Sequence, residues 1–377
     1  MTFMQMAKLK RLASKPKLVE PVQSNAVLNA KSTSKEFVTD IVKADDDAVG
    51  DAKWQSIIKI AEVNLHNSVA KDTREQYNYW CNRFRKFCSD FNRVYLPFGE
   101  MTCIGFLSYL AENSEGIGGV DQARSAIRKM FYLNFPNREC PTESERVSMV
   151  VKGIKRRFKK PVQKKKPLAA DDFSKLLVVI TSNGDLHGSK LVDVRFAAQI
   201  ALMYCTFSRY EEAAALRLED IVEEEEDIVV NFPKGKQYQF GESRTAVILN
   251  QPQLKVNPVL VIKFYVRKVQ EFGKDSQLLF PAVRTRGKKV GLLDYAASYD
   301  CVLKQFKKYA GKAGIAGSPK DYGLHSCRRG AVTTSANNGC DDHTIQKQMR
   351  VASTSTVRRY ATLDKKRLGK ANRFLFK

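Results

Sequence analysis

Histidine is scarce in this chain, and the residue patterns of several common classes of protein are missing from it. Only four histidines occur among 377 residues, and none of the eight cysteines forms a C-x-x-C pair. Structural zinc is usually held by cysteines and histidines at short spacings, so no zinc site is expected. The chain has no apolar run of about 18 residues, which predicts that no segment spans a membrane. The scattered cysteines are typical of reduced, mostly buried thiols in an intracellular protein.

Acidic residues are few in comparison with basic ones. The chain has 64 Lys plus Arg against 40 Asp plus Glu, which gives a formal net charge of +24 and a pI near 9.6. This charge is unusual for an enzyme of small metabolites and suits a polyanionic partner, most simply nucleic acid. Attachment to a ribosome or to a membrane surface is the alternative that charge alone leaves open.

The first part of the chain divides into an arm and a helical domain. Residues 1–50 are polar and without periodicity, which predicts a disordered basic arm. Residues 54–158 show helical spacing of apolar residues and no strand pattern, which predicts an all-helical domain. We expect helices over residues 54–69, 103–112, 119–132 and 142–158, with another that opens at Asp72 or Thr73 as N-cap.

A basic segment with two prolines, KRRFKKPVQKKKP, follows this domain and predicts a linker over residues 159–167. It is a solvated connector, a strap along the DNA backbone or a nuclear localisation signal. A flexible linker between two basic domains suggests a clamp that closes around a duplex. The basic residues that we expect to contact DNA here are Arg157, Lys159, Lys164 and Lys165.

Residues 168–377 predict a second domain that mixes helices with a small sheet. The β-branched runs at 227–232 and 245–249 predict two strands of one sheet. The expected fold class is therefore mainly α with a small antiparallel β-sheet (α+β). The expected helices are one capped by Asp171 or Asp172, followed by 190–207, 211–218, 258–272, 295–313, 324–337, 341–349 and 353–360.

His325 and Arg328 lie three residues apart at the start of a predicted helix. This spacing favours one helix face, and a helix N-terminus attracts anions, so the pair predicts a phosphate pocket. An H-x-x-R pattern on its own is common. A surface arginine beside a core histidine is the alternative.

Three segments taken together carry a family resemblance. They are TFSRYEE (206–212) with LEDI (218–221) after it, LHSCRRG (324–330), and VASTSTVRRY (351–360). In this order and spacing they resemble the tyrosine recombinases, the integrase family of site-specific DNA recombinases. The resemblance covers most of residues 165–370, and residues 56–155 resemble the family's core-binding domain more loosely. The expected architecture is a two-domain DNA clamp.

The resemblance implies a role for each matched residue. Tyr360 matches the nucleophile, Arg209 and Arg328 match the arginines that bind the scissile phosphate, and His325 matches the proton-transferring histidine. Lys234 matches the hairpin lysine that protonates the leaving oxygen, with Lys236 as a possible substitute and a DNA contact. Ordinary surface or turn positions are the alternative for Arg209, Lys234 and Tyr360. Glu212 and Asp220 also fall at matching places.

The chemistry that this family performs needs neither metal nor ATP, because the bond energy is kept in a 3′-phosphotyrosine. We therefore expect no cofactor. The expected partners are double-stranded DNA and three further copies of the chain, in a tetramer on two duplexes. A mobile element is the expected origin, with a nuclear location in a eukaryote, or the cytoplasm or nucleoid in a prokaryote. The tail, residues 365–377, docks on a neighbouring subunit or folds back on its own core.

Two positions depart from the family pattern. Phe207 stands where a small residue is usual. Val351 stands nine residues before Tyr360, where the family has His or Trp, and Arg350, which we also expect to contact DNA, stands in place of the glycine before it. Valine donates no hydrogen bond, and one such donor is worth roughly 3–4 kcal/mol. Either packing is what this position needs, or Arg350 or His343 substitutes, or the chain is a DNA-binding protein with weakened or no cleavage. A DNA-relaxing topoisomerase is a more distant alternative.

We expect DNA affinity to fall steeply with salt, because many phosphates are neutralised. Six phosphate contacts would cost roughly a thousandfold in affinity between 50 and 200 mM salt. Fluorescence anisotropy of a labelled duplex at several NaCl concentrations measures the slope. A dissociation constant that does not respond to salt would contradict the inference drawn from charge.

Overall fold

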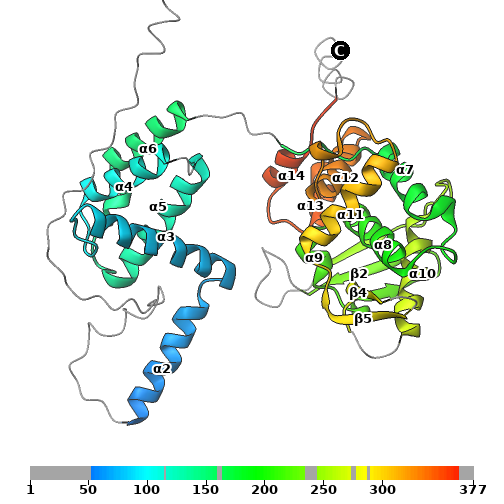
Figure 1. Cartoon of the computed structure of the whole chain (residues 1–377), viewed down its shortest axis with the longest axis horizontal. Coiled ribbons are helices and arrows are strands. Elements are labelled where there is room, and N and C mark those ends of the chain that lie inside the picture. The colour runs from blue at the N-terminus through cyan, green and yellow to red at the C-terminus, as the bar shows by residue number, and fades with distance from the viewer. Residues whose placement is uncertain are drawn as a thin grey trace, which may run out of the picture. The chain divides into compact units, whose positions relative to one another are not determined.

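The computed structural model describes residues 52–113, 116–158, 164–233, 244–272, 277–286 and 289–364 (Figure 1). The chain forms two compact units, Met1–Val162 and Gln163–Lys377, which divide within the predicted linker. The predictions for the arm (1–50), the tail (365–377), Lys159, Lys234 and Lys236 fall outside the described residues.

The described part of the first unit is helical, as its sequence pattern predicts. Its elements are α2 (Ala52–Asn67), α3 (Lys71–Asp90), α4 (Glu100–Glu112), α5 (Gly116–Asn134), the 3-10 turn η1 (Pro141–Glu143) and α6 (Glu145–Arg157).

Aromatic side chains fill the core of this unit. Phe84 of α3 is fully buried and packs with ring centroids 5.0 Å from Phe98 and 4.9 Å from Phe106. Phe131 of α5 packs on Phe98 from the other side, at 5.2 Å. The apolar stripe of α3 is therefore core, and its polar face is left to carry the arginines.

Helices α2, α4 and α5 begin two or three residues earlier than predicted, and two further N-termini differ in how they are capped. Helix α3 starts at Lys71 after Ala70, so the predicted capping by Asp72 or Thr73 is wrong, and Asp72 lies in the first turn. Helix α6 starts later than predicted because Ser144 caps it, accepting a hydrogen bond from the Val147 amide at 3.2 Å. Polar residues that suit a cap also suit a first turn, so the sequence leaves these starts ambiguous.

The second unit adds strands to a helical body. Its helices are α7 (Ala170–Ile180), α8 (Leu191–Cys205), α9 (Tyr210–Ala214), α10 (Pro258–Glu271), α11 (Tyr299–Lys312), α12 (His325–Asn337), α13 (Asp342–Met349) and α14 (Thr354–Tyr360). Short 3-10 turns lie at Ser182–Gly184 (η2), Leu218–Asp220 (η3) and Pro319–Asp321 (η4).

Helix α8 is the centre of the second unit's core. Eleven consecutive residues, Val194 to Tyr204, are buried, as its apolar composition predicts. Helix α7 packs on it through Phe173, whose ring stacks on Tyr204 at 4.1 Å between centroids. Ala169 precedes α7 without a side-chain cap, so the capping predicted for Asp171 or Asp172 is wrong. Asp172 instead is buried and accepts the Ala316 amide at 3.3 Å.

Two antiparallel sheets complete this unit. The predicted strands are β2 (Ile228–Phe232) and β3 (Arg244–Ile248), and β1 (Ile221–Glu223) pairs on the other side of β2. The hairpin of β4 (Pro281–Arg286) and β5 (Lys289–Ala296) was not predicted. The helix predicted over 295–313 starts only at Tyr299, where Ser298 caps it. In Figure 1 this hairpin lies at the opposite end of the unit from α12, α13 and α14.

Helix α12 lies very close to the backbone that enters the unit. The Leu168 amide donates to the Ser326 carbonyl at 3.0 Å, and a Cβ added to Gly330 would lie 1.9 Å from the Leu168 carbonyl oxygen. A glycine is therefore needed at position 330, because the Leu168 backbone leaves no room for a side chain. The described helices include none that is both long and apolar enough to cross a bilayer.

Gly330→Ala tests this close approach. Overpacking against backbone should destabilise the second unit by about 2 kcal/mol or more, which is roughly 4–8 °C in melting temperature for a unit of this size. Differential scanning calorimetry measures the loss. Gly153→Ala is the matched control, since it is also a helix-interior glycine but has no atom within 4 Å of the added carbon. A stable Gly330→Ala variant would contradict the assigned packing.

Candidate active site

The segment between α8 and α9 makes a sharp turn that places Arg209. Helix α8 ends at Cys205, and Phe207 then adopts a left-handed conformation with φ 54°. Arg209 is the N-cap of α9, and the carboxylate of Glu212 in the first turn accepts the Arg209 amide at 2.9 Å. This local bond fixes Glu212 beside the Arg209 side chain. Phe207 adopts a backbone conformation that glycine favours and that costs energy for other residues, so tertiary contacts must hold this turn.

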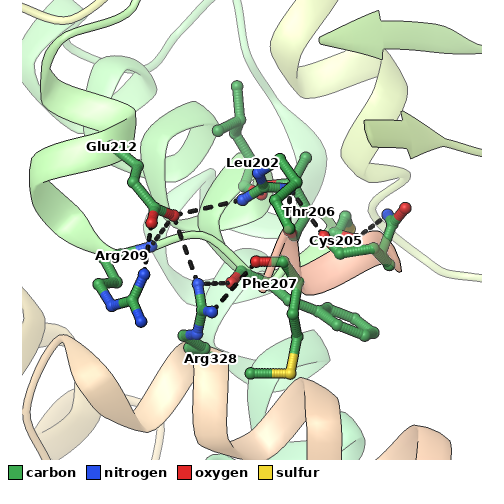
Figure 2. A network of polar contacts seen from close by, with 10 residues as sticks. Leu202, Cys205, Thr206, Phe207, Arg209, Glu212 and Arg328 are labelled. Carbon is green, nitrogen blue, oxygen red and sulfur yellow. Dashed lines mark hydrogen bonds and ion pairs between the residues drawn. The ribbon is translucent and has the colours of Figure 1, made fainter. Parts of the chain in front are cut away.

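The Glu212 carboxylate is the centre of the site. Its side chain is 5% exposed and pairs with three guanidinium groups. Oε1 accepts Arg209 Nη1 at 2.6 Å, while Oε2 accepts Arg328 Nη1 and Arg350 Nη2, both at 3.3 Å. Figure 2 shows Arg209, from the turn before α9, and Arg328, from α12, reaching the carboxylate.

Charge and burial oppose one another in this cluster. Burial by itself raises the pKa of Glu212, but Arg328, Arg350 and the Arg209 amide outweigh it and hold the pKa below its ordinary value. Burial lowers the pKa of Arg328, and the Glu212 carboxylate only partly offsets this. For Arg209 burial also acts to lower the pKa, yet Glu212 and the Tyr360 hydroxyl raise it overall. Glu212 is therefore ionised at neutral pH.

Arg328 is held entirely by the protein. It has no exposed surface, and beyond Glu212 it donates to the Phe207 carbonyl at 2.6 Å and the Met349 carbonyl at 3.1 Å. Its Nε atom is buried without a hydrogen-bond partner among the described residues. A bound phosphate oxygen could accept from such a group.

His325 begins α12 and is exposed, whereas Arg328 three residues later points inward. The amides of Ser326 and Cys327 donate to the carbonyls of Gly323 and Leu324, at 2.8 and 3.2 Å. These two amides are therefore not free to bind an anion, so the anion attraction predicted for this helix start can come only from its remaining groups, such as its side chains.

Tyr360 is the last residue of α14 and lies against both arginines. Its ring centroid is 5.3 Å from the Arg328 guanidinium carbon, and its hydroxyl interacts with Arg209. The segment after it is fastened to α12. Thr333 bonds the Tyr360 carbonyl and the Thr362 amide, at 3.4 and 3.2 Å, and Asn337 bonds the Thr362 carbonyl at 3.2 Å.

The Val351 side chain packs in the hydrophobic core of this part of the unit. It is 2% exposed and lies in an apolar cluster with residues of α12, α13 and α14, against which Tyr360 also packs. Its amide donates to the Gln346 carbonyl at 3.2 Å, so the backbone offers no spare donor either. Of the proposed substitutes, Arg350 is buried on Glu212, and His343 is exposed in the first turn of α13.

The predicted DNA contacts differ in their surroundings. Arg157 is exposed and pairs with Glu112 of its own unit. Lys164 is exposed, and Lys165 donates to the Lys320 carbonyl at 2.6 Å, so this end of the predicted linker lies on the second unit. The Arg350 side chain is 1% exposed and makes its contacts within the protein.

Sequence reasoning did not recognise the central place of Glu212 and Arg350. Glu212 had a signal, since an acid three residues after an N-cap can bond the N-cap amide. Arg350 had no such sequence signal. Its buried side chain goes with a left-handed backbone conformation, with φ 55°, which is unusual for an arginine and is not indicated by the neighbouring residues. The site thus unites Arg209, Arg328 and Tyr360 around Glu212, which was matched to the family without a role, and Arg350, which was considered only as a contact to DNA.

Comparison with known families agrees with this geometry. The model described as the phage integrase family matches residues 166–367. An integrase/recombinase XerD homologue of Selenomonas ruminantium is 23% identical over 300 residues, covering 80% of this chain and 84% of its own.

Solved structures of similar fold are also DNA recombinases. The XerH site-specific recombinase, bound to palindromic difH substrate after cleavage, superposes with a TM-score of 0.57 at 19% identity, covering 80% of each chain. The Tn1549 transposon integrase, in complex with transposon right-end DNA, gives 0.55 at 14% identity, covering 83% of this chain and 96% of its own. These likenesses establish the fold.

Glu212→Gln removes the shared charge while keeping the side-chain size. Because the folded pKa lies below the ordinary value of 4.5, the carboxylate stabilises the fold above that pH, and the effect is lost as pH falls through the folded pKa. We expect a loss of roughly 3–5 kcal/mol at pH 7, shrinking below pH 4.5. Urea titrations of wild type and variant across this range measure the difference.

Glu219→Gln is the control, since Glu219 is 74% exposed and pairs with Arg217 at 3.6 Å. Exposed pairs contribute little, so its loss should stay below about 1 kcal/mol. A Glu212→Gln loss that is equally small, or that does not change with pH, would show that the cluster does not depend on this charge.

Proposed function

The chain belongs to the phage integrase family, the tyrosine recombinases, and from this premise we propose that it cuts and rejoins DNA at specific sites through a 3′-phosphotyrosine intermediate. In this proposal Tyr360 is the nucleophile, Arg209 and Arg328 bind the scissile phosphate, His325 transfers protons and Lys234 protonates the leaving oxygen. No metal or ATP takes part.

One observation carries the proposal. Tyr360 lies against the guanidinium groups of Arg209 and Arg328, which come from the turn before α9 and from α12 and pair with one carboxylate. A phosphodiester that is attacked by a tyrosine gains negative charge on its two non-bridging oxygens. Two arginines are suited to this charge, because they stay protonated and donate in a forked geometry. Preorganised donors of this kind are commonly the largest contribution to catalysis.

The proposed step balances without a cofactor. The Tyr360 oxygen forms a bond to phosphorus, the bond from phosphorus to the 5′-oxygen breaks, and the proton of the phenol passes to His325 or to water. Lys234 gives a proton to the leaving 5′-oxygen, and the reverse reaction rejoins the strand. Arg328 is fully buried in the present structure, so phosphate contact with it requires the groups that cover it, Tyr360 among them, to move.

A second candidate function follows from Val351. With an apolar side chain at the position where the family has a donor, the protein would bind DNA while cleaving it weakly or not at all. We further propose that active assemblies are tetramers on two duplexes, and that a eukaryotic host would import the chain into its nucleus.

Covalent trapping on nicked duplexes separates the two functions. A pool of duplexes with random sequence and a nick near the centre loses the short 5′-hydroxyl strand after cleavage, so the adduct cannot be reversed. We expect wild type to form an SDS-stable adduct with a subset of the pool and Tyr360→Phe to form none. Denaturing gels and sequencing of the trapped strands measure this.

Tyr322→Phe is the matched control. Tyr322 is buried in the same unit and donates to the Ala316 carbonyl at 2.5 Å, away from the cluster, so this variant should trap DNA as wild type does. Trapping by Tyr360→Phe at the wild-type level would rule out the nucleophile. Binding without any adduct in wild type would favour the second candidate.

A further inference from the structure

Arg328 and Arg350 make parallel sets of contacts. Arg328 joins the Phe207 carbonyl to the Met349 carbonyl, and Arg350 joins the neighbouring carbonyls of Thr206 and Gln348, at 2.9 and 2.7 Å. Both also donate to Oε2 of Glu212 at 3.3 Å. Two guanidinium groups therefore tie the same turn before Arg209 to the same helix end, around one oxygen atom.

Arg350 has a further anchor that fixes its plane. Its guanidinium carbon lies 3.7 Å from the centroid of the Phe232 ring, at the end of β2, and Phe232 is fully buried. A planar cation on an aromatic face is a favourable arrangement that lysine reproduces poorly. Arg350 thus connects Glu212 and the turn before Arg209 to the central strand of the sheet.

The backbone at Arg350 is strained. Its φ of 55° and ψ of 47° are left-handed, and the residue ends α13 at the position that glycine usually fills. A strained residue persists when its surroundings hold it, and such residues cluster at functional sites. At this position the Arg350 side chain, which a glycine would not have, makes the contacts that hold the turn before Arg209.

We propose that Arg350 is a positioning residue that holds Glu212, the turn before Arg209 and the end of α13 in place while Arg328 turns from the protein to a DNA phosphate. This role rests on the proposed function, in which Arg328 binds the scissile phosphate.

The need for such a residue follows from the burial of Arg328. Among the described residues, the Nη atoms of Arg328 donate to protein oxygens, so contact with a phosphate must replace at least one of these bonds. Without Arg350, the release of Arg328 would break the side-chain link between the turn before Arg209 and the end of α13. Of the three cluster arginines, only Arg209 would then remain paired with Glu212. With Arg350 in place, its guanidinium still joins the turn before Arg209 to the end of α13 and still pairs with Glu212 when Arg328 is released.

Single-turnover cleavage tests the role on DNA. The probe is the nicked duplex recovered from the trapping selection, with protein in excess, and the variant is Arg350→Lys, which keeps the charge. We expect adduct formation at saturation to slow by roughly ten- to a hundredfold, as small misplacements of reacting groups do. The dissociation constant for the duplex should stay within about twofold of wild type, because Arg350 does not contact DNA in this role.

Arg195→Lys is the matched control. Arg195 is 1% exposed in the same unit, but it bonds Gln199 and Gln305 at 3.1 and 2.7 Å rather than the cluster. Its lysine variant should cleave within about twofold of wild type. A parallel fall in affinity and rate for Arg350→Lys would mean a direct DNA contact and would overturn the positioning role, as would an unchanged rate.

A double-mutant cycle tests the shared contacts without DNA. Urea midpoints are measured for Arg328→Lys, Arg350→Lys and the double variant. Because each arginine keeps the turn tied when the other is lost, the double shift should exceed the sum of the single shifts. Additive shifts would overturn the proposal. If Arg350→Lys fails to fold, Arg350→Gln, which keeps a planar amide donor, replaces it in both experiments.

Different experimental results would contradict the proposed function and the role of Arg350. If wild type forms no adduct with any duplex, the proposed function fails, and the role of Arg350 toward a phosphate fails with it. If wild type cleaves through Tyr360 but Arg350→Lys is as fast as wild type, only the role of Arg350 fails.

Discussion

The second unit depends on one buried carboxylate that three arginines share. Guanidinium groups repel one another, and burial removes the water that would screen them, so the Glu212 carboxylate offsets the repulsion within the cluster. Even with it, the group carries a net charge of +2. Backbone carbonyls of residues 206, 207, 348 and 349 accept further hydrogen bonds from the Nη atoms of Arg328 and Arg350 and spread this charge over peptide dipoles. The result is a site whose unbalanced charge suits a phosphodiester.

The same interaction joins segments that are far apart in the chain. Glu212 belongs to α9, Arg328 to α12 and Arg350 to the end of α13, while Tyr360 ends α14 and lies on Arg328. The apolar cluster around Val351 lies next to this charged group. Compared with the family's His or Trp, Val351 donates no hydrogen bond, but it completes the apolar cluster that packs against α14. In the proposed reaction, the arginines must make up for that donor.

Much of the helical framework could be predicted from sequence, because long apolar patterns such as that of α8 leave little choice. The strands β2 and β3 were also predictable from their β-branched runs. The β4–β5 hairpin was not, since Arg284, Thr285 and Lys289 give it no alternating pattern, and turn and strand signals overlap there. Helix starts were missed where several polar residues compete for the cap.

The site was predictable as a set of residue types and only partly as a geometry. Order and spacing pointed to Arg209, Arg328 and Tyr360, which the fold brings together. The direction of the Arg350 side chain depends on one left-handed backbone angle that no local pattern reveals.

The central claim is that Tyr360 attacks a DNA phosphate held by this cluster. Tandem mass spectrometry of the trapped adduct, after digestion with nuclease and trypsin, tests it most directly. The account predicts a nucleotide joined through its 3′-phosphate to Tyr360, in the peptide that this residue begins. A nucleotide on any other residue, or one joined through its 5′-phosphate, would contradict it.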